Sequence, residues 1–267
     1  MPGLLEGKLG LIAGLSNKYG VAWGITQACV REGARLAFTH QERYAEQATD
    51  LTAGVPGAVR LPLDNAADEQ QVTAAFARLE REFGGLDFLV HSIAFASPAT
   101  FASRFTDTTL EDFHTAMDSS AYSLLALTRG AEPLFRKRGG GSVVAMTYYG
   151  GEKVVLGYRI MGVAKATLDS IGRYLAVELG PDNIRVNLLS LGPLRTMSAR
   201  GIPGFMGLKK VSAQMSPLRR DIDTDDAGNA AVFLCSDLGR NVTGEILHVD
   251  SGYNILGMWE PPVQDHE

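Results

Sequence analysis

The sequence has few cysteines, no long hydrophobic run and no excess of basic residues. The two thiols, Cys29 and Cys235, both fall in segments expected to be helical, so buried thiols are expected and neither a disulfide framework nor a metal site is indicated. The apolar stretch 9–15 is too short to span a membrane, and no basic region followed by a long apolar stretch marks a signal peptide. A formal net charge of -5 gives no reason to expect a nucleic-acid partner. The expected location is the cytoplasm.

The chain shows a regular alternation of short apolar runs and helical segments. Its 267 residues, 45% of them hydrophobic, have the composition of an ordinary globular protein. Strands are expected at 8–14, 34–40, 58–64, 86–93, 142–148, 185–191 and 245–249. Helices are expected at 21–32, 42–52, 68–83, 110–136, 158–179 and 225–236. This pattern predicts an α/β protein: a doubly wound, Rossmann-like parallel sheet with helices on both faces. No linker or repeat interrupts it, so residues 1–267 are expected to form a single domain.

A glycine-rich segment follows the first expected strand. Glycines there allow the backbone to approach a ligand closely, and the following helix offers free N–H groups to a phosphate. The spacing is not G-x-G-x-x-G, and from the residues alone a tight turn is an equal alternative. Its place in the first β-α unit favours a dinucleotide, because such sheets bind ligands beyond the carboxyl ends of their strands.

The ends of the second and third strands bear on the choice of cofactor. Gln41 stands where an enzyme strict for NAD often has an acidic residue, and it would not repel a 2′-phosphate, while Arg43 would attract one. The choice between NADH and NADPH therefore stays open. Asp64 ends the third strand, where it would either bind the adenine amino group or cap the next turn.

Tyr158 and Lys165 are seven positions apart. If they share a helix, both side chains lie on one face, two turns apart. An ammonium group and a phenol so placed can share a ligand. For an arbitrary pair, two side chains lying along a helix surface would be the simpler interpretation.

The surrounding residues resemble the short-chain dehydrogenase/reductase superfamily, and within it the enoyl-acyl-carrier-protein reductases of bacterial fatty-acid synthesis. In the superfamily pattern a serine is followed by twelve residues and then by Tyr-x-x-x-Lys. Counted back from Lys165, the tyrosine position holds Met161 and the serine position holds Tyr148. The tyrosine instead stands at Tyr158, which is the enoyl reductase pattern. Segments 91–96, 192–196, 233–238 and 248–250 also resemble the family, whereas Gly20, Ala94 and Ser251 depart from it.

The resemblance implies an enzyme that reduces the C=C bond of enoyl-acyl-carrier-protein thioesters with NADH, NADPH not being excluded. It implies that Tyr158 donates to the thioester oxygen, that Lys165 holds the nicotinamide ribose, and that Tyr148 gates the pocket, aids protonation or only packs. The cofactor contacts it implies are Gly14, Gly20, Val21, Gln41, Asp64, Asn65, Ser92, Ile93, Lys165, Leu194, Thr196, Met197 and Ser198. The substrate contacts it implies are Ala96, Tyr148, Tyr158, Met161, Ile202, Phe205 and Met206. A homotetramer is also implied, and no metal.

Residues 194–216 are expected to cover the substrate as a loop and a helix. Segment 202–207 combines large apolar side chains with glycines, which suits a loop that closes over an acyl chain. The basic pairs 209–210 and 219–220 would dock an acidic carrier protein or be ordinary surface charges, whereas cluster 136–138 suits a helix C-terminus. His91 is expected to make a strand-end hydrogen bond.

Two other functions remain alternatives. One is a carbonyl reductase or alcohol dehydrogenase, against which Met161 and Tyr148 argue. The other is a nucleotide-binding regulator that keeps the fold without the reaction, against which Tyr158 and Lys165 argue.

Overall fold

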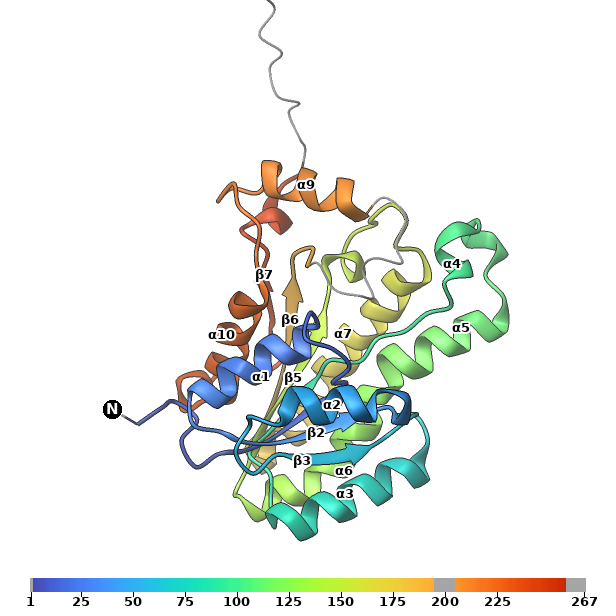
Figure 1. The fold of residues 1–267 in the computed structure, drawn as a ribbon. Helices are drawn as coiled ribbons and strands as arrows, with labels where there is room; N and C mark the ends of the chain where they lie inside the picture. The colour runs from blue at the N-terminus through green and yellow to red at the C-terminus, as the bar shows by residue number, and fades with distance from the viewer. Residues whose placement is uncertain (1, 195–204, 258–267) are drawn as a thin grey trace, which may run out of the picture.

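The computed structural model of the protein describes residues 2–194 and 205–257. Its centre is one sheet of seven parallel strands in the order β3-β2-β1-β4-β5-β6-β7 (Figure 1). The strands are β1 (Leu9–Ala13), β2 (Arg35–His40), β3 (Val59–Pro62), β4 (Phe88–His91), β5 (Gly141–Thr147), β6 (Ile184–Leu191) and β7 (Ile246–Val249). The predicted Rossmann-like parallel sheet is therefore confirmed.

Helices cover both faces of the sheet, as predicted. They are α1 (Val21–Arg31), α2 (Ala45–Thr52), α3 (Glu69–Phe83), α4 (Ala99–Ala102), α5 (Leu110–Met117), α6 (Ser123–Lys137), α7 (Ile160–Leu179), α9 (Phe205–Met215) and α10 (Thr224–Cys235). The core on one face includes residues of α3, α6 and α7, and the core on the other includes residues of α1, α2 and α10. Among the described residues, no helix is both long and apolar enough to cross a membrane.

The unbroken apolar runs of the strands serve these two cores. In β5, Val143 and Ala145 pack into one core while Val144 and Met146 pack into the other. Successive side chains of a strand point to opposite faces, so a strand buried on both sides favours apolar residues at successive positions. This explains why the strands show no regular polar alternation, although single buried polar residues such as Asn187 and Ser190 occur in β6.

The order in which the chain adds strands to the sheet reverses at the middle of the sheet, between β1 and β4. From β1 the chain adds β2 and β3 on one side, and β4 then pairs with the other side of β1. The carboxyl ends of β1 and β4 therefore lie side by side with connections leading in opposite directions, which opens a crevice suited to a ligand. Helix α9 lies beyond the carboxyl ends of β6 and β7 (Figure 1).

Two helices differ from the sequence prediction. The expected helix 110–136 is interrupted by a wider π-helical turn, Asp118–Tyr122, between α5 and α6. The expected helix 158–179 begins only at Ile160, because Arg159 adopts a positive φ of 50° that no helix accommodates. Tyr158 therefore lies in the turn before α7, and the expectation that it shares a helix with Lys165 is wrong.

Candidate active site

Gly14 brings the ends of β1 and β4 into close contact. Its φ is +97°, and a Cβ there would lie 2.5 Å from the carbonyl oxygen of Ser92 and 2.9 Å from Cγ1 of Ile93. The Gly14 N–H donates to Oγ1 of Thr39 at 3.0 Å, and the Ser92 N–H donates to the carbonyl of Ala13 at 3.0 Å. Three predicted cofactor residues, Gly14, Ser92 and Ile93, are thus brought together at the crevice.

The start of α1 provides the features of an anion site. Gly20 is the N-cap residue and makes no side-chain capping bond, and the first turn, beginning at Val21, contains no acidic residue. A helix start without a side-chain cap leaves N–H groups free for a phosphate, and the helix dipole adds to the attraction. These residues fit the diphosphate of a dinucleotide through backbone N–H groups, without a side-chain hydroxyl at position 20.

The residues predicted at the adenosine end of the cofactor, Gln41 and Asp64, form hydrogen bonds with each other's segments. Nε2 of Gln41 donates to the carbonyl of Asp64 at 3.0 Å, and Oδ1 of Asp64 accepts from the N–H of Glu42 at 2.7 Å. Arg43 donates to Oε1 of Gln41 through Nε at 3.0 Å and Nη2 at 2.7 Å. Oδ1 of Asn65 accepts from the N–H of Ala67 at 2.9 Å. Asp64 thus holds a turn, as in its capping alternative, and the Arg43 side chain lies against Gln41 just after β2.

Tyr148 and Tyr158 form an edge-to-face pair. Their ring centroids are 4.9 Å apart at an interplanar angle of 73°, and both side chains are partly buried. Between them in sequence is a short helical turn, η4 (Tyr149–Gly151), in which a Cβ on Gly150 would lie 2.5 Å from Cδ1 of Tyr158. The η4 turn and the Tyr148 ring therefore place Tyr158, although it is not on α7.

Lys165 lies on α7 and is 4% exposed. Its Nζ donates to the carbonyl of Met146, near the end of β5, at 2.7 Å. Burial lowers the pKa of Lys165 to about 8, against the opposing effect of Asp169. Among the described residues no hydrogen bond joins Nζ to the Tyr158 hydroxyl. Lys165 and Tyr158 thus come from separate elements, Lys165 from α7 and Tyr158 from the turn before it.

Both tyrosines keep their protons at neutral pH. Burial raises the pKa of Tyr158, with Tyr148 and Asp169 adding to the effect. Burial also raises the pKa of Tyr148. Tyr158 is therefore a neutral hydrogen-bond donor.

An apolar cluster lies beside Tyr158. It consists of buried Ala96, Ala116, Ile160 and Met161, with Phe101, Met117 and Tyr158 packed against it. The predicted substrate residues Ala96, Met161 and Tyr158 thus adjoin one another, and an acyl group next to the phenol would meet apolar surface here.

The sequence did not indicate the π-helical turn or its serine. Ser120 is fully buried, and its Oγ accepts from the N–H of Phe95 at 2.9 Å and lies 3.0 Å from the Phe95 carbonyl. It thereby anchors the loop that ends in Ala96. Single π-turns inside helices occur often at functional sites, but no spacing signal in the sequence marks this one.

The predicted contacts from residue 194 onwards lie at or beyond the end of the first described segment. Leu194 is described and is buried in the core beside α1 and α10. Thr196, Met197, Ser198 and Ile202 lie outside the described residues. Phe205 and Met206 begin α9, and their side chains also lie outside what the structure describes.

For the basic pair 209–210, docking of a carrier protein and ordinary surface charge were the alternatives, and neither fits Lys209. Lys209 is 8% exposed, and its Nζ pairs with Oδ2 of Asp221 at 2.9 Å. It is held inside the protein and is not available to a carrier protein. Lys210 is exposed.

His91 and Arg136, two further residues considered in the sequence, make contacts within the fold. His91 is fully buried with Nε2 2.8 Å from Oγ of Ser123, and burial, with Lys165 nearby, lowers its pKa to about 3. It stays neutral and agrees with the expected strand-end hydrogen bond. Arg136 pairs with Asp182 at 2.7 Å at the end of α6. Residues 2–194 and 205–257 contain no cluster of three or more His, Cys, Asp or Glu able to hold a metal.

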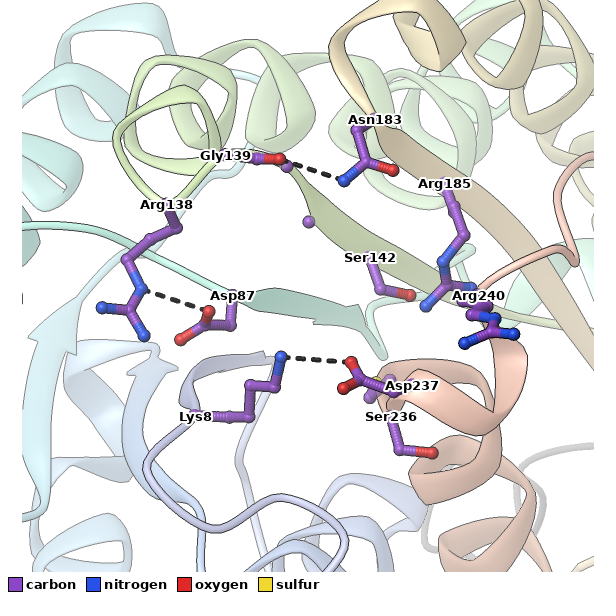
Figure 2. Close-up of a pocket in the computed structure, with 13 residues that line it drawn as sticks. Lys8, Asp87, Arg138, Gly139, Ser142, Asn183, Arg185, Ser236, Asp237 and Arg240 are labelled. Atoms are coloured by element: carbon purple, nitrogen blue, oxygen red, sulfur yellow. Dashed lines mark hydrogen bonds and ion pairs between the residues drawn. The ribbon is translucent and has the colours of Figure 1, made fainter.

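A polar cavity of about 140 Å³ lies at the opposite, amino-terminal end of the sheet (Figure 2). Ion pairs neutralise two of its cations: Lys8 with Asp237 at 3.3 Å, and Arg138 with Asp87 at 3.1 Å. Arg185 donates to the carbonyl of Leu234 at 2.6 Å and so caps the C-terminus of α10. These contacts give the cavity a structural explanation, and it lies far from the tyrosine pair.

Known proteins resemble this chain over almost its whole length. The family model described as "Enoyl-(Acyl carrier protein) reductase" matches residues 14–254. The NADH enoyl-[acyl-carrier-protein] reductase FabI of Rickettsia prowazekii is 42% identical over 255 residues, which is 96% of this chain and 97% of that protein. The corresponding enzyme of Aquifex aeolicus is 42% identical over 96% of this chain and 95% of its own.

Solved structures agree in fold. The enoyl-acyl-carrier-protein reductase of Anaplasma phagocytophilum in complex with NAD has a TM-score of 0.92 and 42% identity, covering 98% of this chain and 99% of that one. The Bacillus cereus reductase with NADP+ and indole naphthyridinone has a TM-score of 0.93 and 40% identity, covering 96% of this chain and 100% of that one. With the shifted tyrosine and the seven-stranded parallel sheet, these similarities show that the chain belongs to the enoyl-acyl-carrier-protein reductase family.

Proposed function

We propose that this protein reduces the C=C bond of trans-2-enoyl thioesters on acyl carrier protein with NADH, as a step of type II fatty-acid elongation. The observation that carries the proposal is the position of Tyr158. It contacts Tyr148 and adjoins the apolar cluster that includes Met161, which occupies the ordinary tyrosine position of the superfamily. In a ketone the hydride adds to the carbonyl carbon itself, whereas in an enoyl thioester it adds to the β-carbon, two bonds beyond the carbonyl carbon. A phenol moved in this way suits the thioester oxygen, which lies correspondingly farther from the reacting carbon.

Residues at the crevice fit a dinucleotide. The close backbone approach at Gly14 and the N-terminus of α1 would hold the diphosphate, and Lys165 would hold the nicotinamide ribose. No acidic side chain ends β2, and Arg43 is nearby, so NADPH is a possible second cofactor. The Rickettsia relative is named for NADH, whereas the Bacillus cereus structure holds NADP+.

When bound, NADH supplies the hydride for the β-carbon of the enoyl group. Negative charge then develops on the thioester oxygen, and the protonated Tyr158 hydroxyl would donate a hydrogen bond to it. One well-placed donor of this kind contributes about 3 kcal/mol to the transition state. Lys165 would orient the ribose with its ammonium group, while Tyr148 limits the space around the Tyr158 ring and so helps to orient it.

A complex of several copies is part of the proposal. Tyr174 and Val177 on α7 are 78% and 81% exposed, and a groove of about 270 Å³ beside them is lined by residues such as Leu125 and Ile171. Exposed apolar surface of this kind supports a homotetramer built on α6 and α7. The acyl carrier protein as substrate carrier and a cytoplasmic location complete the proposal.

The decisive experiment follows NADH oxidation with a trans-2-enoyl thioester. We expect Tyr158→Phe to lower kcat/KM on the order of 100-fold, since about 3 kcal/mol of transition-state stabilisation is lost, with little change in the Kd for NADH.

The same assay separates the alternatives. Turnover of 3-ketoacyl thioesters in preference to enoyl thioesters would support a carbonyl reductase. Tight binding of NADH without turnover of any enoyl thioester would support a regulator. Either result would overturn the proposal.

A further inference from the structure

Asp169 lies behind the candidate site on the buried face of α7. It follows Lys165 by four residues, so the two side chains project from one helix face a turn apart. Lys165 is 4% exposed and Asp169 is 3% exposed. Within the described part of the chain, neither residue forms an ion pair within 4 Å, with the other or with a third residue. They still act on each other through their charges, since Asp169 opposes the lowering of the Lys165 pKa by burial and Lys165 opposes the raising of the Asp169 pKa by burial.

The carboxylate of Asp169 packs against the turn that supports the tyrosines. A Cβ on Gly151 would lie 2.8 Å from Oδ2 of Asp169 and 3.0 Å from the backbone of Lys165, so this turn fits directly over the pair. Thr147 at the end of β5 faces the carboxylate, yet neither Oγ1 of Thr147 nor Oδ1 of Asp169 has a well-formed hydrogen bond among the described residues. Burial of a carboxylate with so few partners weakens a fold.

Other charged groups face this pair from three elements. Glu152, just after η4, raises the pKa of Asp169, whereas Arg173, one turn further along α7, lowers it. Glu152 is itself held by Nε2 of His248 on β7 at 2.7 Å. From β4, His91 faces Lys165 but is neutral above about pH 3. Of these groups, only Asp169 opposes the lowering of the Lys165 pKa by burial.

We propose that Asp169 is a positioning residue for Lys165: its buried carboxylate keeps the ammonium group charged and directed towards the end of β5, ready for the cofactor ribose. The proposal rests on the function proposed above, because it assumes that Lys165 binds the cofactor. A ribose-binding lysine must remain protonated, and burial alone acts against that. Asp169 would compensate for burial without occupying the cofactor side of the ammonium group.

Asp169→Asn tests the proposal through the pH dependence of NADH binding. The pKa of Lys165 is about 8, so binding by the wild-type protein should weaken as the pH rises through 8. Loss of a negative charge about 6 Å away, at an effective dielectric constant of about 20, should move this transition down by one pH unit or more. At pH 8 the Kd for NADH should rise about tenfold, while at pH 6 it should change by less than about threefold. Asp169→Glu, which keeps the charge, should restore most of the wild-type profile.

Glu82→Gln is the matched control, since it removes one negative charge from an exposed position on α3, away from the candidate site and from the groove on α6 and α7. An unchanged transition in Asp169→Asn, or a shift of equal size in Glu82→Gln, would overturn the proposal. Binding is measured by fluorescence without turnover, so absence of enoyl reduction does not affect the result. A wild-type protein that does not bind NADH would instead refute the proposed function.

A double variant covers the case in which Asp169→Asn does not fold. Lys165→Met/Asp169→Asn removes both buried charges, and we expect it to fold and to show a cooperative thermal unfolding transition, because no uncompensated buried ammonium group remains. A double variant that also fails to fold would show that Asp169 supports the fold independently of Lys165, which would overturn the proposal.

Discussion

Replacement of Gly14 by alanine tests the close backbone contact on which the cofactor site depends. The φ of +97° places an L-residue in a strained region, at a cost of about 1–2 kcal/mol. The new Cβ would also lie 2.5 Å from the Ser92 carbonyl oxygen, an atom of the neighbouring chain segment that cannot rotate away. Relief of that overlap requires movement of β1 or β4 and should cost about 2 kcal/mol more.

Gly7→Ala isolates the second contribution. Gly7 also has a positive φ, +71°, but it is exposed and a Cβ there would meet nothing within 4 Å. It should therefore carry only the cost of conformational strain. For a chain of this size, an additional 2 kcal/mol should lower the unfolding midpoint of Gly14→Ala by about 4–8 °C relative to Gly7→Ala.

The two variants should differ more clearly in cofactor binding. Displacement of Ser92 and Ile93 alters the crevice itself, so the Kd for NADH should rise at least about tenfold in Gly14→Ala and stay unchanged in Gly7→Ala. Thermal unfolding and fluorescence titration measure the two effects. Equal midpoints and equal Kd values in the two variants would refute the argument that β1 and β4 need this glycine in order to form the site.

Two further predictions concern buried polar groups. Burial lowers the pKa of His91 to about 3 in the folded protein, against 6.5 in the unfolded chain. The contribution of neutral His91 to the free energy of unfolding is therefore complete above pH 6.5, and up to about 5 kcal/mol of it is lost as the pH falls towards 3. Urea denaturation at pH 7 and 5 should show this loss, and His91→Asn should make the difference smaller; an equal difference in that variant would contradict the prediction. Ser120→Ala should leave Phe95 without its hydrogen bonds and raise the KM for the enoyl substrate about tenfold, while Ser119→Ala should not; equal KM values would contradict it.

The sequence predicts the sheet well, because its strands are buried on both faces and therefore read as continuous apolar runs. Gly14, Ser92 and Ile93 were expected at the cofactor through the family resemblance, and the structure brings them together because parallel strands place their carboxyl ends at one edge. The position of Tyr158 was not predictable. Arg159 adopts a positive φ although it is not a glycine, so no residue preference marks the start of α7.

Two buried charges were missed for different reasons. Lys209 looked like surface charge because its partner Asp221 is twelve residues away, beyond the reach of any helical spacing. Asp169 was detectable, since it follows Lys165 by four residues on a face otherwise built of residues such as Met161 and Leu168. A charged residue on the apolar face of a helix signals a buried partner, and that signal was present in the sequence.

The η4 turn joins the two halves of the candidate site. Gly150 packs against the ring of Tyr158, and the next residue, Gly151, packs against the carboxylate of Asp169. Tyr158 therefore reaches the site from the turn before α7, whereas Lys165 reaches it from within the helix. Any side chain added to either glycine would push the turn away from α7, and both the phenol and the counter-charge of the ammonium group would move with it. The function of the tyrosine and lysine thus depends on a pair of glycines as much as on the helix that follows.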